Sequence, residues 1–478
     1  MSTEKQEKQD LSKLTDEFVY GSLALSPVSA TSAGYHEHAG VKLDQKLDDY
    51  SAAGIQDQQQ FYSSFHDRLA AIKQDQLSSE ERADFQIIQN QTELALLELR
   101  EIQSYRHNPT VYVELIGNAL FNPFVLEYAP LDSRYRDIIA RLSLVPALLD
   151  QAKANLVDAP EVWNRVAQEE GDGDIDLIDK ALRAKVPSAL QADFDRAASG
   201  ALAALRAFNS YLKTDLSRKT SDWRLGKEKY DKKFAYTLVT GKQPAQVLAE
   251  AEAALKDIRD QMAKLAAPHS VKAALDKIAQ QHATPAAYMD QATKDLDEAT
   301  NFVRQKHLVT LPSRDNLKVI PTPEFMRGIY AVAGFNPAPA LEPQLGAFYW
   351  VTPIPSNWPK ERIESKLREY NRFGLMEITI HEAMPGHYVQ FEVADNLQPQ
   401  SRRVLRNIFG NGPYVEGWAT YAQQLMSDEG FLDNSVDLRL TLYKQLLRAI
   451  ANAIIDIRFQ TMGMTEQEAM DLMVRDTF

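Results

Sequence analysis

The sequence HEAMPGH at residues 381–387 determines how the rest of the chain is interpreted. It places two histidines and a glutamate within seven residues, after a largely apolar run over 373–380. A second charged island, YVEGW, follows at residues 414–418. Two imidazoles and one carboxylate are a common ligand set for zinc when a fourth position is left for water. The two stretches together predict a metal site.

The spacing of the two histidines predicts a distorted helix. Metal-binding histidines on a straight helix are usually four residues apart, so that both rings share one face. His381 and His387 are six residues apart, which on a regular helix would turn the second ring by about 120°. Pro385 lacks a backbone N–H and disfavours helical dihedrals in the residue before it, and Gly386 tolerates unusual backbone. We therefore expect a break or bulge between the histidines, without which the site cannot form.

The acidic residues of the two stretches have separate predicted roles. A glutamate directly after the first histidine typically accepts a proton from metal-bound water and passes it to the leaving amine, a role that Glu382 fits. Glu416 begins a helix-like run and is the expected third ligand. Glu377 is the alternative, because it lies four residues before His381 on the same face. It is either a ligand or a hydrogen-bond partner of an imidazole.

Composition limits the class of protein. The 478 residues are 44% hydrophobic and 25% charged, as expected for a globular chain of one to three domains. A net charge of −13 at pH 7 argues against a nucleic-acid partner, because no basic face is available for phosphates. The chain has no cysteine, so a metal site must use nitrogen and oxygen ligands. It has neither a membrane-spanning apolar run nor a signal-peptide pattern, which predicts a soluble, cytoplasmic protein, or an exported one if a leader was removed.

Most of the chain has the periodicity of amphipathic helices. Apolar residues recur every three or four positions in three long segments: 57–104, 134–156 and 174–212. Pro244 opens a further helix that extends through Met262. A loop is expected over 26–38, where proline and glycine interrupt the pattern.

A small sheet is expected directly before the histidine motif. Three short runs rich in β-branched and aromatic residues carry this prediction: 307–312, 317–321 and 347–352. The fold class is therefore mainly α with a small β-sheet next to the metal site. Three parts are expected along the chain: a disordered N-terminus over 1–12, a helical region over 13–306 that forms one wall of a cleft, and the sheet with the catalytic helices over 307–478. We expect the last two to form one continuous unit.

Longer strings around these motifs resemble the bacterial domain-of-unknown-function 885 family, which is grouped with gluzincin-like zinc metallopeptidases. The two central strings are HEAMPGHYVQ (381–390) and YVEGWATYAQQL (414–425). Three more match as well, so the resemblance covers most of the chain: SPVSATSAGYHEH (26–38), GKEKY (226–230) and GAFYWVT (346–352).

The resemblance implies one zinc ion per chain, held by His381, His387 and Glu416, with Glu382 as general base. It also implies a multi-helix, cleft-bearing architecture similar to carboxypeptidase Taq and thimet oligopeptidase.

Two departures from the family pattern affect the expected site. Members tend to carry a D-x-x-x-H pair after the glutamate motif, whereas Asp456 is followed here by Gln460 and no histidine lies beyond His387. Other side chains are then candidates for stabilising an oxyanion: Tyr421, Tyr443, Arg448 and Arg458. Many members also run further, so a truncated chain is one interpretation of an end at Phe478 within a helical pattern.

The substrate is expected to be a peptide or a small amide. Phe348, Tyr349 and Trp350 are the candidate substrate-binding residues, because their strand could pair with an extended peptide. His36 and His38 are a second candidate metal patch. The predicted function is zinc-dependent hydrolysis of peptide bonds. The alternative is a catalytically idle metal-binding protein that binds peptides, although the presence of Glu382 favours activity.

Overall fold

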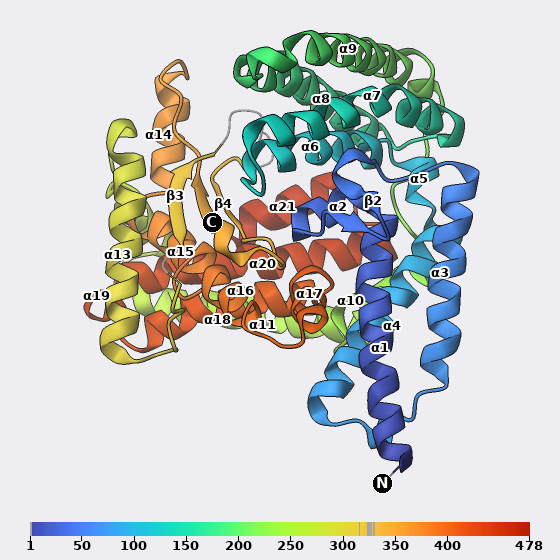
Figure 1. Cartoon of the computed structure of the whole chain (residues 1–478). Helices are drawn as coiled ribbons and strands as arrows, with labels where there is room; N and C mark the ends of the chain where they lie inside the picture. The colour runs from blue at the N-terminus through green and yellow to red at the C-terminus, as the bar shows by residue number, and fades with distance from the viewer. Residues whose placement is uncertain (1, 315, 323–326, 328–329) are drawn as a thin grey trace. The chain divides into compact units, whose positions relative to one another are not determined.

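The computed structural model describes residues 2–314, 316–322, 327 and 330–478, with side chains from Leu11 onward (Figure 1). These residues form two compact units, and the chain passes between them several times. Unit 1 consists of Met1–Trp223, Ala338–Leu345 and Leu397–Gly410. Unit 2 consists of Arg224–Pro337, Gly346–Asn396 and Asn411–Phe478. Both units are mainly helical, as the sequence predicts.

The units are divided at other positions than the expected ranges 13–306 and 307–478, whose roles as a cleft wall and a catalytic region stay predictions. Helix α1 spans Ser2–Leu25 and so includes most of the segment 1–12 for which we expect disorder. The side chains of residues 1–10 lie outside the described part of the chain.

Unit 1 is a set of packed helices around aromatic and aliphatic side chains. Its helices are α1, α2 (Pro27–Ala33), α3 (Ala52–Ala70), α4 (Ser79–Leu97), α5 (Ser104–His107), α6 (Thr110–Val125), α7 (Leu131–Asn155), α8 (Glu161–Asp176), α9 (Gln191–Thr214) and α17 (Gln400–Ile408). One hydrophobic cluster includes Phe18, Phe65 and Phe85 together with Val404 and Leu405 of α17. Residues that are distant in sequence therefore complete the core of this unit.

The loop expected over 26–38 is in part a helix. Pro27 occupies the first turn of α2, where its missing N–H has no intrahelical partner to lose. Gly34 ends the helix with a φ of 77°, a conformation that suits glycine. The two-residue strands β1 (Glu37–His38) and β2 (Val41–Lys42) then pair antiparallel.

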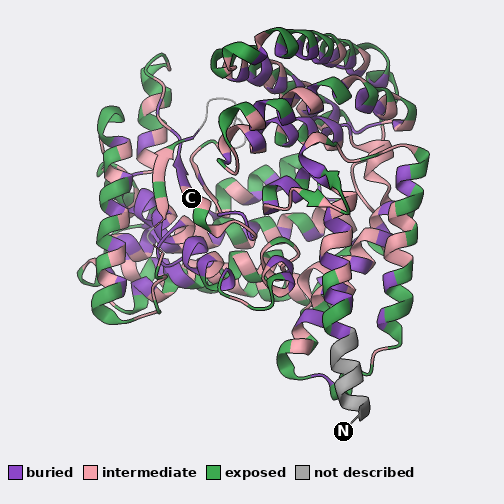
Figure 2. Cartoon of the chain, viewed as in Figure 1, coloured by how far each residue is buried: buried purple, intermediate pink, exposed green. Residues whose placement is uncertain are grey.

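Unit 2 surrounds the histidine motif with helices. They are α10 (Lys227–Leu238), α11 (Pro244–Ala266), α12 (Val271–Ile278), α13 (Tyr288–Lys306), α14 (Lys360–Glu369), α15 (Arg372–Glu382), α16 (His387–Ala394), α18 (Gly412–Asp428), α19 (Phe431–Asn434), α20 (Val436–Met462) and α21 (Glu466–Asp476). The helix predicted to open at Pro244 is confirmed as α11. Figure 2 shows α15 as largely buried, and its side chains contribute to the main core of the unit. No helix of the described residues is long and apolar enough to cross a membrane.

The sheet of unit 2 has three strands in the order β3-β5-β4. Strands β3 (Leu317–Pro321) and β5 (Ala347–Val351) pair parallel, as expected for two of the three predicted runs. The third strand is β4 (Ala333–Asn336), which pairs antiparallel with β5, and the strand predicted over 307–312 is wrong. Helix α13 reaches Lys306 and ends at His307 with a φ of 53°, and the apolar residues that follow pack on the core without a strand partner.

Candidate metal centre

The helix that carries the first histidine breaks before the second, as the spacing predicts. Helix α15 ends at Glu382, and α16 begins at His387. Between them the Met384–Pro385 peptide is cis. The Gly386 N–H donates to the carbonyl oxygen of Ile380 at 2.9 Å, which folds the connection back over the end of α15. The expected distortion between the histidines is therefore confirmed.

Gly386 is required by a close approach of backbone. A Cβ atom at this position would lie 1.8 Å from the carbonyl oxygen of His381 and 2.4 Å from that of Ile380. Both contacts are with main-chain atoms, so no side-chain rotation could relieve them. Only glycine fits this turn.

The turn brings His381, His387 and Glu416 together. Oε2 of Glu416 lies 3.3 Å from Nε2 of His381 and 3.7 Å from Nε2 of His387. The two imidazole rings are 4.7 Å apart and nearly perpendicular. Among the described residues, these three form the group whose ligand atoms all lie within 4.8 Å of one another.

These separations fit a zinc ion. Tetrahedral zinc with bonds of about 2.0–2.1 Å to nitrogen and oxygen places its ligand atoms about 3.4 Å apart. The Glu416–histidine distances of 3.3 and 3.7 Å are close to that value. Burial lowers the pKa of His387 to about 4, and the neighbouring His381 acts in the same direction. A neutral imidazole at pH 7 has the free lone pair that a metal requires.

The pKa values of the other two residues, His381 and Glu416, are shifted by their contact with each other. Burial lowers the pKa of His381, but its hydrogen bond to Glu416 and the charge of Glu382 outweigh burial and raise it. The hydrogen bond from His381 is the largest influence on Glu416 and lowers the pKa of that carboxyl. The Glu416 side chain is 67% exposed, so the site is open to solvent on this side.

Glu382 lies beside the three residues and is held by strand β4. The backbone N–H of Phe335 donates to its carboxylate, and the Phe335 ring stacks on His387 at 6.2 Å. Burial raises the pKa of Glu382, and the charge of Glu416 raises it further. Burial raises the pKa of Tyr330, and the charge of Glu382 raises it further, so that ring is a neighbour of Glu382. Neither Phe335 nor Tyr330 was singled out from the sequence, because strand β4 itself was not predicted.

Glu377 lies behind His381 rather than beside Glu416. Its side chain is fully buried, and burial raises its pKa well above the usual range. Gln423 joins the two residues: its Oε1 is 3.2 Å from Nδ1 of His381, and its Nε2 donates to Oε2 of Glu377 at 3.0 Å. Of the two roles proposed for Glu377, the geometry fits indirect support of an imidazole better than that of a ligand.

Trp418, on the helix that carries Glu416, forms hydrogen bonds with the turn between the two histidines. Its indole Nε1–H donates to the carbonyl oxygens of Pro385 and Gly386 at 3.0 and 3.1 Å. Helix α18 therefore supplies a candidate ligand and also holds the turn that precedes His387. The sequence marks Trp418 as part of the motif but gives no sign of these bonds.

The four candidates for an oxyanion stabiliser each have contacts with residues outside the triad. Tyr421 is 53% exposed and packs against Trp418. The Tyr443 hydroxyl donates to Gln261 of α11, while Arg448 pairs with Glu369 of α14. Arg458 pairs with Glu252. These three contact residues of other helices from α20, and a role for any of the four at the site stays a prediction.

Strand β5 does not offer the substrate surface that was expected. Tyr349 is fully buried and its hydroxyl bonds Thr379 at 3.0 Å, while Trp350 is 2% exposed. Only Phe348 is half-buried. Because β5 is the central strand, both its edges are already paired with β3 and β4, so it cannot bind an extended peptide as an added strand.

Asp456 and Gln460, at the two ends of the D-x-x-x-H pattern, both form hydrogen bonds within unit 2. Asp456 accepts a hydrogen bond from the Tyr230 hydroxyl at 2.6 Å, and Gln460 accepts one from the Leu225 N–H at 2.8 Å. The bonds join α20 to Tyr230 of the GKEKY segment and to Leu225, the residue before that segment. Gln460 thus has a defined packing role in place of the histidine typical of the family.

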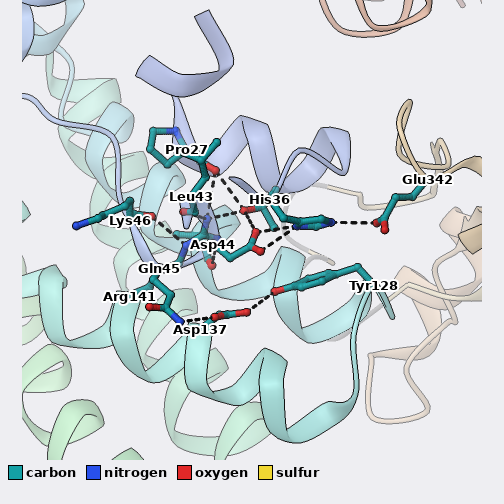
Figure 3. Close-up of polar contacts among 12 residues, drawn as sticks. Pro27, His36, Leu43, Asp44, Gln45, Lys46, Tyr128, Asp137, Arg141 and Glu342 are labelled. Atoms are coloured by element: carbon teal, nitrogen blue, oxygen red, sulfur yellow. Dashed lines mark hydrogen bonds and ion pairs between the residues drawn. The ribbon is translucent and has the colours of Figure 1, made fainter. Parts of the chain in front are cut away.

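His36 and His38 do not form a second metal patch. Figure 3 shows His36 between two carboxylates of unit 1: Nδ1 is 2.9 Å from Asp44, and Nε2 is 3.2 Å from Glu342. Burial alone would lower the pKa of His36, but the hydrogen bonds and charges of these carboxylates outweigh it and raise the pKa. His38 instead pairs with the Tyr35 hydroxyl. The two imidazoles thus have different partners.

Two solved structures are similar to this chain over nearly its whole length. A candidate lipoprotein of unknown function from Shewanella oneidensis is 27% identical, with a TM-score of 0.78, over 98% of this chain and 86% of that one. A candidate lipoprotein from Colwellia psychrerythraea is 16% identical, with a TM-score of 0.77, over 98% of this chain and 87% of that one. No curated protein matches the sequence. The family model described as bacterial protein of unknown function, DUF885, matches residues 27–478, and the chain therefore belongs to the DUF885 family.

Proposed function

We propose that this protein is a zinc-dependent hydrolase of peptide bonds or small amides, with one zinc ion per chain. The observation that carries the proposal is the convergence of His381, His387 and Glu416 at separations suited to zinc, with Glu382 alongside. Bound zinc would polarise a scissile carbonyl and make a bound water more acidic. The exposure of Glu416 favours a catalytic site, since a purely structural zinc is usually enclosed by four protein ligands.

Glu382 is the residue that moves the proton. Its carboxylate is fixed by the Phe335 N–H, and burial raises its pKa towards the range in which a carboxylate takes up and returns protons efficiently. In the proposed reaction a carboxylate oxygen of Glu382 takes a proton from the attacking water. The same oxygen then delivers it to the nitrogen of the leaving amine.

We propose that an extended substrate binds along the edge of strand β4. The Thr352 N–H donates to the carbonyl oxygen of Val332, so these two residues are a hydrogen-bonded pair. Hydrogen-bonded and non-hydrogen-bonded pairs alternate along an antiparallel ladder, so Ala333 and Phe335 belong to non-hydrogen-bonded pairs with β5. The backbone groups of Ala333 and Phe335 consequently point away from β5, towards the open edge of the sheet. The Phe335 N–H reaches Glu382 on this side. A peptide added along this edge would run past the general base.

The first experiment separates hydrolysis from metal binding. Wild-type protein should contain about one zinc per chain by elemental analysis and cleave members of a peptide library followed by mass spectrometry. Glu382→Gln should retain zinc and lose cleavage, whereas His387→Ala should lose zinc. Equal cleavage by wild type and Glu382→Gln would refute the general-base role. Binding of zinc and peptides without any cleavage would favour the idle peptide-binding alternative.

The second experiment tests the substrate edge without changing the protein. Methylating one backbone nitrogen of a cleaved peptide at a time removes single N–H donors. Each methylation at a nitrogen that pairs with β4 should raise KM by about 2- to 10-fold, the value of one hydrogen bond. Methylation further along the peptide serves as the matched control. An unchanged KM at every methylated position would contradict binding as an added strand.

An exported location is proposed as well, because the Shewanella protein is described as a candidate lipoprotein. Fractionation of the native cell with an antibody to the chain tests this. Recovery with cytoplasmic markers alone would refute it.

A further inference from the structure

We propose that Gln423 is a positioning residue that accepts a hydrogen bond from Nδ1 of His381, so that Nε2, on the Glu416 side, is the nitrogen left to bind a metal. This inference rests on the proposed function for its purpose, but its geometry is independent of any ion. Residues that bind a metal-ligating histidine from behind are usually carboxylates or backbone carbonyls. Here a neutral amide takes that place.

Helix α18 presents Gln423 and Glu416 on one face. The two residues are seven positions apart, which amounts to two turns of helix and leaves their side chains about 20° from alignment. Gln423 is 4% exposed, and Glu416 is 67% exposed. The same helix therefore supplies the outer carboxylate of the triad and, one layer deeper, the amide that contacts His381.

The orientation of the Gln423 amide follows from its surroundings. Its Nε2 lies 3.1 Å from the backbone carbonyl oxygen of Glu377 and 3.0 Å from Oε2 of the same residue. It also lies 2.9 Å from Oε1 of Gln445. A backbone carbonyl can only accept, so the amide must present its NH₂ group on that side. Its Oε1 must then face His381.

The protonation of Nδ1 in His381 follows from that orientation. Oε1 of Gln423 has no proton to give and lies 3.2 Å from Nδ1 of His381, so Nδ1 carries the hydrogen. Nε2 is then the nitrogen on the Glu416 side, 3.3 Å from Oε2 of that residue, where it donates a hydrogen bond when no ion is present. A metal would take the place of that proton. The buried amide thus leaves Nε2 of His381 as the nitrogen that can bind a metal.

The decisive experiment exchanges the amide and the buried acid. Gln423→Leu removes the acceptor, and zinc affinity should fall about 10- to 100-fold in a chelator-competition titration. Glu377→Gln keeps an acceptor for Gln423 and should change affinity less than about 3-fold. The double variant Gln423→Glu with Glu377→Gln again offers an oxygen to Nδ1 and a donor behind it, so affinity should return to within about 3-fold of wild type. Gln424→Leu, at an exposed neighbouring position on α18, is the matched control.

A second readout does not depend on zinc. Metal-free protein labelled with ¹⁵N-histidine should give a protonated Nδ1 resonance for His381, assigned by comparison with His381→Asn. In Gln423→Leu the Nδ1 resonance should shift towards that of an unprotonated nitrogen, because only the Nε2–Glu416 hydrogen bond is left. An unprotonated Nδ1 of His381 in the wild type, full zinc affinity in Gln423→Leu, or no recovery in the double variant would overturn the inference. Wild-type protein that shows the protonated Nδ1 but binds no zinc would refute the proposed function and leave the role of Gln423 standing.

Discussion

Replacing Gly386 with alanine tests whether the turn between the two histidines assembles the site. The new Cβ would lie 1.8 Å from the carbonyl oxygen of His381. Close carbon–oxygen contacts in proteins are about 3.3 Å or longer, so the turn would have to move by about 1.5 Å. That movement would also break the 2.9 Å bond from the Gly386 N–H to Ile380.

The expected cost of this substitution combines two effects. A buried hydrogen bond left unmade costs about 1–3 kcal/mol. Forcing packed groups apart adds about 1–3 kcal/mol. The free energy of unfolding of unit 2 should therefore fall by about 2–6 kcal/mol, and zinc affinity should fall with it because His387 is displaced.

Gly417→Ala is a matched control on the same site. Position 417 adjoins Glu416 within α18, and no atom lies within 4 Å of a Cβ placed there. Alanine should raise helix stability by about 0.5–1 kcal/mol and leave zinc binding unchanged. Urea denaturation of metal-free protein followed by circular dichroism, with zinc titration, measures both effects. A Gly386→Ala protein within 0.5 kcal/mol of wild type, with normal zinc affinity, would refute the reasoning.

Three further predictions concern buried or half-buried polar groups. Burial raises the pKa of Asp295 to about 7. As pH rises from about 4 to 7, the free energy of unfolding should therefore fall by on the order of 4 kcal/mol. Denaturation across that pH range should show this fall, and Asp295→Asn should remove it. The raised pKa of His36 means that its pairing with Asp44 contributes stability below about pH 6.5, which is lost as pH rises through the folded pKa. The free energy of unfolding should therefore change less between pH 6 and pH 9 for His36→Gln than for wild type. Tyr349→Phe removes the bond to Thr379 and should lower the melting temperature, at a cost of about 1 kcal/mol, while an unchanged KM would agree with a core position for the ring.

The outline of the fold could be predicted because helix periodicity and proline placement are local signals. Pro244 opens α11 where the first-turn preference of proline indicated. Strand assignment failed where pairing outweighed local preference. The run 307–312 has strand-like composition but no partner, whereas β4 contains glycine and asparagine and exists because β5 pairs with it.

The site was predictable to the extent that its residues are close in sequence. The break before His387 followed from Pro385 and Gly386, which are local features. Gln423 and Phe335 could not be identified, because their roles depend on contacts across tens of residues of chain. The contact of Tyr443 with Gln261 of α11 was not foreseen for the same reason, since helix periodicity does not indicate which neighbouring helix each face will contact.

The division of unit 1 into three pieces of sequence has a consequence for synthesis of the chain. Its core cluster joins Phe18 and Phe65 to Ala340, Val404 and Leu405. The ribosome adds Val404 and Leu405 only after most of unit 2 has been translated. Although domains usually fold from the N-terminus as they emerge, the first 223 residues must wait with an incomplete core. Nascent chains stalled before residue 397 should therefore be more sensitive to protease in unit 1 than chains stalled after residue 440.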